Sequence, residues 1–179
     1  MKLIVKLLSV VLIAGGLILI SSFSAEENEP AIIHWYSWEE AITLNEKHPK
    51  KLLIDVYTDW CGWCKKMDKE TFTHPAIIDL VNKDFYAIKL DAEQKEDIVY
   101  KDFTFSFNPE HGRKGAHDLA VSLLDGKMGY PSLVYLNEVQ NRITISPGYK
   151  TVEGLQTELE FIGGEHYTSM NFEEYKSKK

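Results

Sequence analysis

Cysteine is scarce in this chain, and the shortage excludes several classes of protein. The 179 residues include two cysteines, Cys61 and Cys64, which are too few for a disulfide-rich scaffold. They also supply only half of the ligands of a structural zinc site built from four cysteines. No cysteine follows the N-terminal apolar run to accept a lipid, so a lipoprotein is not expected. What remains is one Cys-x-x-Cys pair with the sequence CGWC.

Proline and glycine are also sparse, at 6 and 11 residues, whereas 44% of the residues are hydrophobic and 12% are aromatic. This composition is typical of a globular protein and argues against disorder. The sequence contains no internal repeat and no low-complexity run. Its length suits one domain, because single domains usually have about 100 to 200 residues.

Basic residues are too few to favour binding to nucleic acid. The chain has 20 Lys and Arg residues against 27 Asp and Glu residues, a net charge of −7. Loss of residues 1–24 would remove two lysines and no acids, which brings the net charge to −9. Because binding to a phosphate backbone depends on clustered Lys and Arg, we expect no nucleic-acid partner.

The N-terminus has the features of a secretory signal. Lys2 and Lys6 precede or flank an apolar run over residues 7–20, and Ser22-Phe23-Ser24 then offers small residues at the spacing that signal peptidase prefers. We expect residues 1–24 to be a signal peptide and residues 25–30 a linker, so that the mature protein is periplasmic or secreted. The alternative is an uncleaved membrane anchor, since a membrane span needs about 17 to 25 residues.

Hydrophobic periodicity and turn residues divide residues 31–165 into strands and helices that form one domain. The clearest buried strand is 52–57, a nearly continuous apolar run with one acid, Asp55, inside it. Further strands are expected at 31–36, 85–90, 132–136 and 142–145, and helices at 37–47, after the cysteine pair, and at 75–82, 116–124 and 151–162. Residues 166–179 are expected to form a polar tail.

Residues 92–115 do not fit this alternation, because connections in such domains usually have about 2 to 6 residues. Phe103, Phe105 and Phe107 alternate with small polar residues in this insertion, which would give an extended segment one aromatic face. We expect an edge hairpin that covers the core. The alternative is one wall of a substrate groove.

Several chemistries are open to the cysteine pair. Covalent haem would need a histidine after Cys64, and residue 65 is lysine. Zinc would need two more ligands, and among the six histidines only His111 and His117 are close in sequence, which disfavours zinc without excluding it. A purely structural disulfide across two residues would close a very small loop and stabilise the fold little.

The predicted strand and helix on either side of the cysteine pair favour a redox-active disulfide. A strand that ends before Cys61 and a helix that begins there place the first sulfur, exposed, at a helix N-terminus. Unpaired N–H groups and the helix dipole stabilise a thiolate at such a position. Cys64, one turn further along, can attack the mixed disulfide that the first sulfur forms.

The residues around the pair resemble the active site of the thioredoxin superfamily. The shared pattern is a buried strand with Asp55 six residues before the first cysteine, Trp60 immediately before it, the CGWC motif and a lysine after it. Lys89 stands where the family has a lysine that faces the buried acid. Tyr130-Pro131 stands where the family has a cis-proline.

One position departs from thioredoxin itself. Trp63 replaces the proline usual between the two cysteines, which makes the segment more similar to secreted bacterial thioredoxin-like proteins and to the C-terminal domain of transmembrane thiol:disulfide interchange reductases. The resemblance implies an α/β, thioredoxin-like fold, with a central mixed sheet flanked by helices and an insertion before the third core helix. The redox potential stays open, because the two residues between the cysteines tune it.

The resemblance also implies roles for individual residues. Cys61 and Cys64 would be catalytic, with Asp55 accepting the Cys64 proton and Lys89 paired with Asp55. The substrate-binding candidates are Trp60, Gly62, Trp63, Tyr130 and Pro131. The alternatives are a solvent-exposed acid at Asp55, a solvent-facing Lys89, a trans proline, and core positions for both tryptophans.

These inferences predict a thiol–disulfide oxidoreductase that needs no metal and no organic cofactor. Its partners would be proteins with disulfides or thiols, together with a membrane or soluble electron donor or acceptor. The resemblance favours a reductant over an oxidant. The alternative is a peptide-binding or chaperone-like module of the same fold, in which the disulfide is inert.

Overall fold

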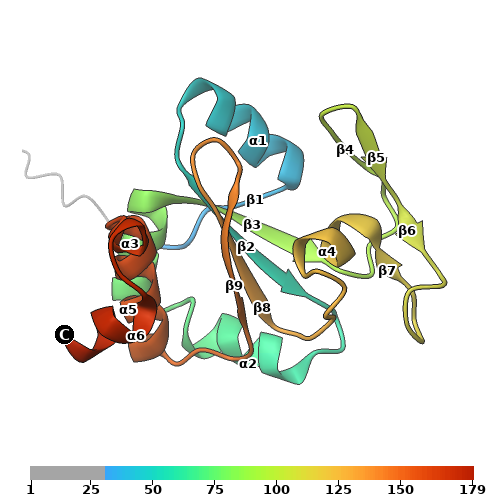
Figure 1. The fold of residues 1–179 in the computed structure, drawn as a ribbon. Coiled ribbons are helices and arrows are strands. Elements are labelled where there is room, and N and C mark those ends of the chain that lie inside the picture. Colours follow the sequence, from blue (N-terminus) through green and yellow to red (C-terminus); the bar gives the residue numbers. More distant parts are fainter. Residues whose placement is uncertain (1–30) are drawn as a thin grey trace, which may run out of the picture.

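The computed structural model describes residues 31–179 as one body around a five-stranded sheet (Figure 1). The strands are β1 (Trp35–Tyr36), β2 (Lys51–Tyr57), β3 (Phe85–Asp91), β8 (Ser132–Leu136) and β9 (Arg142–Pro147). They lie in the order β1-β3-β2-β8-β9. Strands β1, β3 and β2 pair in parallel, β8 pairs antiparallel with β2, and β9 pairs antiparallel with β8. The predicted signal peptide and linker lie outside the described residues.

Five helices cover the two faces of the sheet: α1 (Trp38–Lys47), α2 (Gly62–Glu70), α3 (Pro75–Asp84), α4 (Asp118–Leu123) and α5 (Val152–Gly163). One buried cluster joins the sheet to α2, α3 and α5, and the other joins it to α1 and α4. Side chains of β2 alternate between them, Leu53 in the first and Leu52 and Ile54 in the second. This explains why β2 is apolar on both faces. The mixed sheet with helices on both faces confirms the predicted thioredoxin-like architecture.

Local signals in the sequence account for where the helices begin. Ser37 and Glu40 form a capping box at the start of α1, and Pro75 occupies the first turn of α3, where a missing N–H is tolerated. The expected helix at 116–124 is shorter, because Ala116–His117 form strand β7. His117 then caps α4 through its Nδ1, which accepts from Leu119 N at 3.3 Å.

The insertion folds into two small antiparallel sheets that project from the body beside α4 (Figure 1). β4 (Ile98–Tyr100) pairs with β5 (Phe103–Phe105), and β6 (Phe107–Asn108) pairs with β7. The expectation of a covering hairpin is met in part, because Ile98, Tyr100 and Phe105 pack against the cluster under α1. Phe103, however, is 59% exposed.

The C-terminal segment is more ordered than the expected polar tail. It contains a 3-10 helix, η1 (His166–Thr168), and α6 (Phe172–Ser177). Phe172 and Tyr175 lie one helical turn apart, and each ring centroid is 5.3 Å from that of Phe161 in α5. Two aromatic residues at helical spacing thus hold a largely polar segment onto the core.

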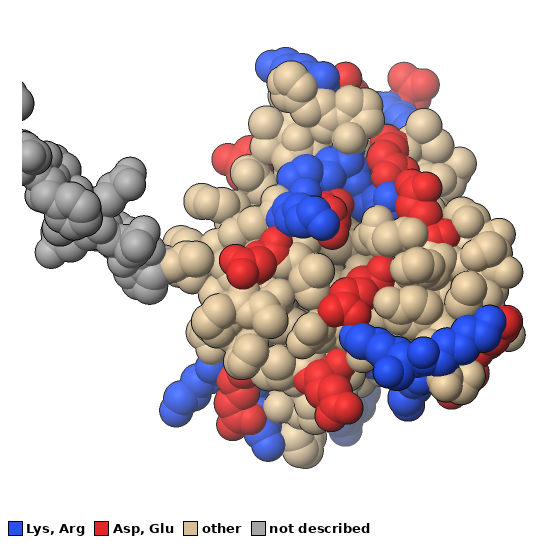
Figure 2. Space-filling view, turned by 90° about the vertical axis from the view of Figure 1, so that its left-hand side faces the viewer, with Lys and Arg blue, Asp and Glu red and all other residues tan. Residues whose placement is uncertain are grey.

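The side of the molecule that carries α3, α5 and α6 is shown in Figure 2. Basic and acidic side chains are interspersed over it, with uncharged surface between them, and neither sign forms a continuous field on this side. None of the helices within residues 31–179 is both long and apolar enough to cross a bilayer.

Candidate active site

The cysteine pair lies where the chain leaves β2 and enters α2, as the sequence predicted. Cys61 is the N-cap of α2, and its Sγ accepts a hydrogen bond from the backbone N–H of Cys64 at 3.1 Å. The two cysteines form a disulfide with a Cα–Cα distance of 5.3 Å. The first sulfur therefore occupies the position where helix N–H groups and the helix dipole favour negative charge.

The disulfide exposes little surface. Cys61 is 5% exposed and Cys64 is 1% exposed. The first sulfur was expected to be exposed, and in this oxidised state Cys61 is instead nearly buried. The reason is geometric, since Cys61 is bonded to a cysteine on the buried side of α2 while its sulfur also caps the helix. A macromolecule that reaches Cys61 must touch the residues around it.

Two exposed tryptophans flank Cys61 in the chain, Trp60 directly before it and Trp63 two residues after it. Trp60 is 54% exposed and Trp63 is 59% exposed, so neither occupies a core position. The Trp63 ring lies 5.4 Å from that of Tyr149, in the loop before α5. Apart from its chain neighbours and the backbone of α2, no heavy atom of residues 31–179 lies within 4 Å of the place where a Cβ of Gly62 would lie. The surface beside the pair is thus open at Gly62 and aromatic on both sides.

Trp60 makes three separate contacts. Its Nε1 donates to Glu93 Oε1 at 2.9 Å, and its ring meets that of Tyr130 edge to face at 6.0 Å. The ammonium of Lys114 lies 4.5 Å from the centroid of its ring. Glu93 and Lys114 belong to the insertion, and sequence reasoning did not single them out. The candidate binding residues in that segment were its alternating aromatic residues.

The buried acid of β2 is paired with the lysine that the resemblance named. Asp55 is 0% exposed, and its Oδ2 accepts from Lys89 Nζ at 2.6 Å. The two residues are register partners on adjacent strands, which brings their side chains together. Burial raises the pKa of Asp55 to about 6, although the charge and hydrogen bond of Lys89 pull it down.

A second carboxylate shares that lysine. Asp68, in α2, also accepts a hydrogen bond from Lys89 Nζ. Burial would lower the pKa of Lys89, but Asp55 and Asp68 outweigh it and raise this pKa. The other oxygen of Asp55, Oδ1, is buried and has no hydrogen-bond partner among residues 31–179. Sequence reasoning missed Asp68, although its spacing of four residues from Cys64 places both on one helix face.

The loop before β8 reaches the site through Tyr130, whose ring contacts that of Trp60. The Tyr130–Pro131 peptide bond is cis, the isomer that the resemblance implied. The carbonyl of Pro131 accepts from Gly148 N at 2.8 Å, which ties this loop to the end of β9. Burial raises the pKa of Tyr130 to about 12, with Glu93 and Asp91 adding to the shift. The binding role of both residues stays a prediction.

His111 and His117, the two histidines close enough in sequence to be zinc ligands, make contacts with other residues. His111 Nε2 lies 3.1 Å from Asp118 Oδ1, and the buried His117 contacts Glu96 O through its Nε2. Within the described part of the chain, no group of three or more His, Cys, Asp and Glu side chains is arranged to hold a metal ion.

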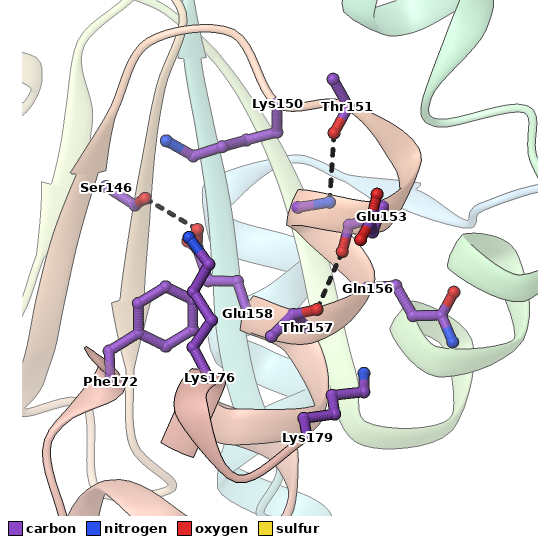
Figure 3. Close-up of a pocket in the computed structure, with 11 residues that line it drawn as sticks. Ser146, Lys150, Thr151, Glu153, Gln156, Thr157, Glu158, Phe172, Lys176 and Lys179 are labelled. Atoms are coloured by element: carbon purple, nitrogen blue, oxygen red, sulfur yellow. Dashed lines mark hydrogen bonds between the residues drawn. The ribbon is translucent and has the colours of Figure 1, made fainter. Parts of the chain in front are cut away.

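A separate pocket of about 770 Å³ lies between the end of β9, α5 and α6 (Figure 3). Two of its polar side chains are hydrogen-bonded: Ser146 Oγ donates to Glu158 Oε2 at 2.9 Å, and Lys150 Nζ donates to the neighbouring Pro147 O at 2.8 Å. Burial raises the pKa of Glu158. None of the residues predicted to form the active site lines this pocket, which we interpret as structural.

A sheet of this topology with a cysteine pair at the start of α2 defines a thioredoxin-fold protein. The chain belongs to the Thioredox_DsbH family, described as "Protein of unknown function, DUF255", which matches residues 20–153.

Solved structures share this fold at low sequence identity. A "DsbH Oxidoreductase" has a TM-score of 0.50 at 17% identity, over 78% of this chain and 92% of that one. A thioredoxin-fold protein from Helicobacter pylori has a TM-score of 0.56 at 16% identity, over 84% and 88%. A putative disulphide-isomerase from Bacteroides thetaiotaomicron has a TM-score of 0.54 at 22% identity, over 80% and 98%.

Curated relatives match over shorter segments. Human spermatogenesis-associated protein 20 is 34% identical over 74 residues, which are 40% of this chain and 9% of that protein. The thiol:disulfide interchange protein DsbD of Vibrio vulnificus is 32% identical over 83 residues, 44% of this chain and 14% of that protein. The match thus spans about a tenth of the length of such relatives, and it confirms the predicted similarity to the disulfide interchange reductases.

Proposed function

We propose that this protein is an extracytoplasmic thiol–disulfide oxidoreductase that exchanges its Cys61–Cys64 pair with disulfides of other proteins, chiefly as a reductant. The observation that carries the proposal is the position of Cys61, whose sulfur caps α2 and accepts the N–H of Cys64. The same N–H and the helix dipole would stabilise the thiolate after reduction. The extracytoplasmic location is supported by the signal-like residues 1–24.

The reaction begins with the reduced pair. The Cys61 thiolate attacks one sulfur of a substrate disulfide, which forms a mixed disulfide and releases the other substrate sulfur as a thiolate. Cys64 then loses its proton and attacks the Cys61 sulfur, which restores the Cys61–Cys64 disulfide and releases the second substrate sulfur. Two electrons pass from the protein to the substrate. A dithiol donor, soluble or in the membrane, must reduce the pair again.

Asp55 is the proposed acceptor of the Cys64 proton, directly or through water. Its carboxylate lies in the strand that leads to the pair, and a pKa of about 6 leaves it ionised at neutral pH and more basic than an ordinary aspartate. Lys89 stabilises the ionised form through the bond of 2.6 Å. Of the predicted substrate-binding residues, Tyr130 contacts Trp60 through their rings.

Reduction of insulin by dithiothreitol tests the proposal, because the separated insulin chains precipitate and scatter light. We expect wild-type protein to accelerate the reaction and Cys61→Ser to abolish the acceleration. Cys64→Ser should retain the first step and accumulate a mixed disulfide with insulin, visible on non-reducing gels. A wild-type protein that turns over neither insulin nor small disulfides would contradict the proposal.

A second candidate function is a peptide-binding or chaperone-like module with an inert disulfide. The low exposure of Cys61 and Cys64, next to two exposed indoles, is the observation in its favour. A redox titration followed by tryptophan fluorescence separates the two candidates. A reduction potential between about −120 and −270 mV would mark a working couple, and one far below about −300 mV an inert bridge.

A further inference from the structure

The insertion is attached at the point where the chain turns toward the cysteines. Ala92 N donates to Tyr57 O at 2.8 Å, at the end of β2, and His117 N donates to Ala92 O at 2.7 Å. The first residue of the insertion is therefore tied to the last residue of β2, and the chain just after the insertion is tied back to that first residue. These two bonds place the start and the end of the insertion beside the chain segment that leads to Cys61.

Two side chains of the insertion use that placement to hold Trp60. Glu93, one residue after Ala92, accepts the indole N–H at 2.9 Å, and Lys114 places its ammonium 4.5 Å from the ring centroid. The edge of Tyr130 contacts the ring from a third direction. The indole is thus restrained at its N–H and over its ring, although 54% of the residue is exposed.

The opposite tryptophan is held differently. Trp63 packs against Tyr149, and the ammonium of Lys66 lies 5.2 Å from its ring centroid. Lys66 belongs to α2 and Tyr149 to the loop before α5, so these contacts come from the common fold. Among the described residues, the insertion thus contacts Trp60, whereas the contacts of Trp63 come from α2 and the loop before α5.

An exposed indole with a fixed orientation is useful to a site whose sulfurs are nearly covered. A polypeptide disulfide that reaches Cys61 brings its flanking residues close to Trp60, the chain neighbour of Cys61. An aromatic surface that is already ordered binds such a segment without losing further side-chain entropy on binding. A small disulfide has no flanking residues and gains nothing from this surface.

We propose that the insertion is a substrate-selectivity element, in which Glu93 and Lys114 are positioning residues that hold Trp60 as a fixed wall for polypeptides with an apolar side chain next to the reacting disulfide. This inference rests on the proposed function, since it concerns the substrate of the same cysteines. It assigns the insertion the groove-wall role for residues at its two ends. The hairpin of β4 and β5 packs on α1 instead.

The test compares two substrates of the full protein: insulin, and hydroxyethyl disulfide, which has no polypeptide flanks. Lys114→Met and Glu93→Ala should each raise the KM for insulin roughly threefold to tenfold with kcat unchanged, because one cation–π contact or one hydrogen bond to a carboxylate is lost. Rates with hydroxyethyl disulfide and the reduction potential should not change. Lys114→Arg and Glu93→Gln, which keep the cation and the acceptor, should restore the KM.

Two further variants sharpen the result. Lys101→Met removes the same charge from the insertion, but its ammonium lies over Tyr100, 4.9 Å from that centroid, so it controls for net charge and should leave the KM unchanged. In a Trp60→Ala background, Lys114→Met should have no further effect, because its contact is already gone.

An insulin KM that neither Lys114→Met nor Glu93→Ala alters would overturn the inference. Equal losses with both substrates would overturn it too, since they would indicate general damage to the fold. Neither result would touch the proposed function, which fails only if the wild-type protein turns over neither substrate.

Discussion

The buried carboxyl of Asp55 makes a prediction about stability that can be worked out in sign and size. The pKa of Asp55 rises from 3.8 in an ordinary setting to about 6 in the fold. A raised pKa means that the folded protein holds the proton more tightly than the unfolded chain does. The stabilisation is therefore fully present below pH 3.8 and is lost as the pH rises through about 6.

The size follows from the shift. A difference of about 2 pKa units, at about 1.4 kcal/mol each, corresponds to about 3 kcal/mol between acidic and neutral pH. Asp55→Asn removes this titration and keeps the size of the side chain, while Lys89 retains Asp68 as a partner. The variant should therefore gain about 3 kcal/mol relative to wild type between pH 4 and pH 8.

Urea unfolding of the oxidised proteins, followed by tryptophan fluorescence at several pH values, measures this difference. Asp79→Asn removes one exposed carboxylate from α3 and controls for the change in net charge. A difference between Asp55→Asn and wild type that stays constant from pH 4 to pH 8 would refute the reasoning. A difference that moves in favour of wild type as the pH rises would show instead that Lys89 outweighs burial and lowers the pKa.

Three shorter predictions concern the surroundings of the site and the fold. Asp68→Asn removes a charge that raises the pKa of Asp55, so the acidic limb of the pH–rate profile for insulin reduction should move to lower pH. Phe172→Ala should lower the free energy of unfolding by about 1 to 3 kcal/mol, measured in urea, because a partly buried ring leaves the contact between α6 and α5. Gly115→Ala should destabilise more than Gly126→Ala: both glycines have positive φ, +77 and +72, but only at Gly115 would a Cβ collide with neighbouring atoms.

The sequence predicted the parts of the site that local rules determine. A continuous apolar run predicted the buried strand with Asp55, and the start of a helix placed Cys61 at its N-cap. The contact between Asp55 and Lys89 was implied by resemblance, and the parallel register of β2 and β3 explains it. Tyr130–Pro131 was placed in the same way, since a proline before a strand does not by itself specify a cis bond.

The contacts that the sequence did not predict depend on packing between distant segments. Asp68 looks like any polar residue of a helix in the sequence, and only the position of Lys89 on β3 gives it a partner. The attachment of the insertion to β2 is made by backbone groups, which carry no sequence signal. Glu93 and Lys114 are therefore ordinary charged residues in the sequence and neighbours of Trp60 only in the fold.

The cost of burying Asp55 is consistent with its proposed role. A free thiol has a pKa of about 8.5, so an ordinary aspartate with a pKa of about 3.9 would take the Cys64 proton against a gap of about 5 units, or about 6 kcal/mol. With the pKa at about 6 the gap is about 2.5 units, or about 3 kcal/mol. Burial of Asp55 therefore lowers the stability of the fold at neutral pH, and the same rise in its pKa lowers the barrier to proton transfer from Cys64. Lys89 limits the shift, because full desolvation without a cation would keep the carboxyl protonated and unable to accept a proton, whereas the charge of Asp68 adds to the shift.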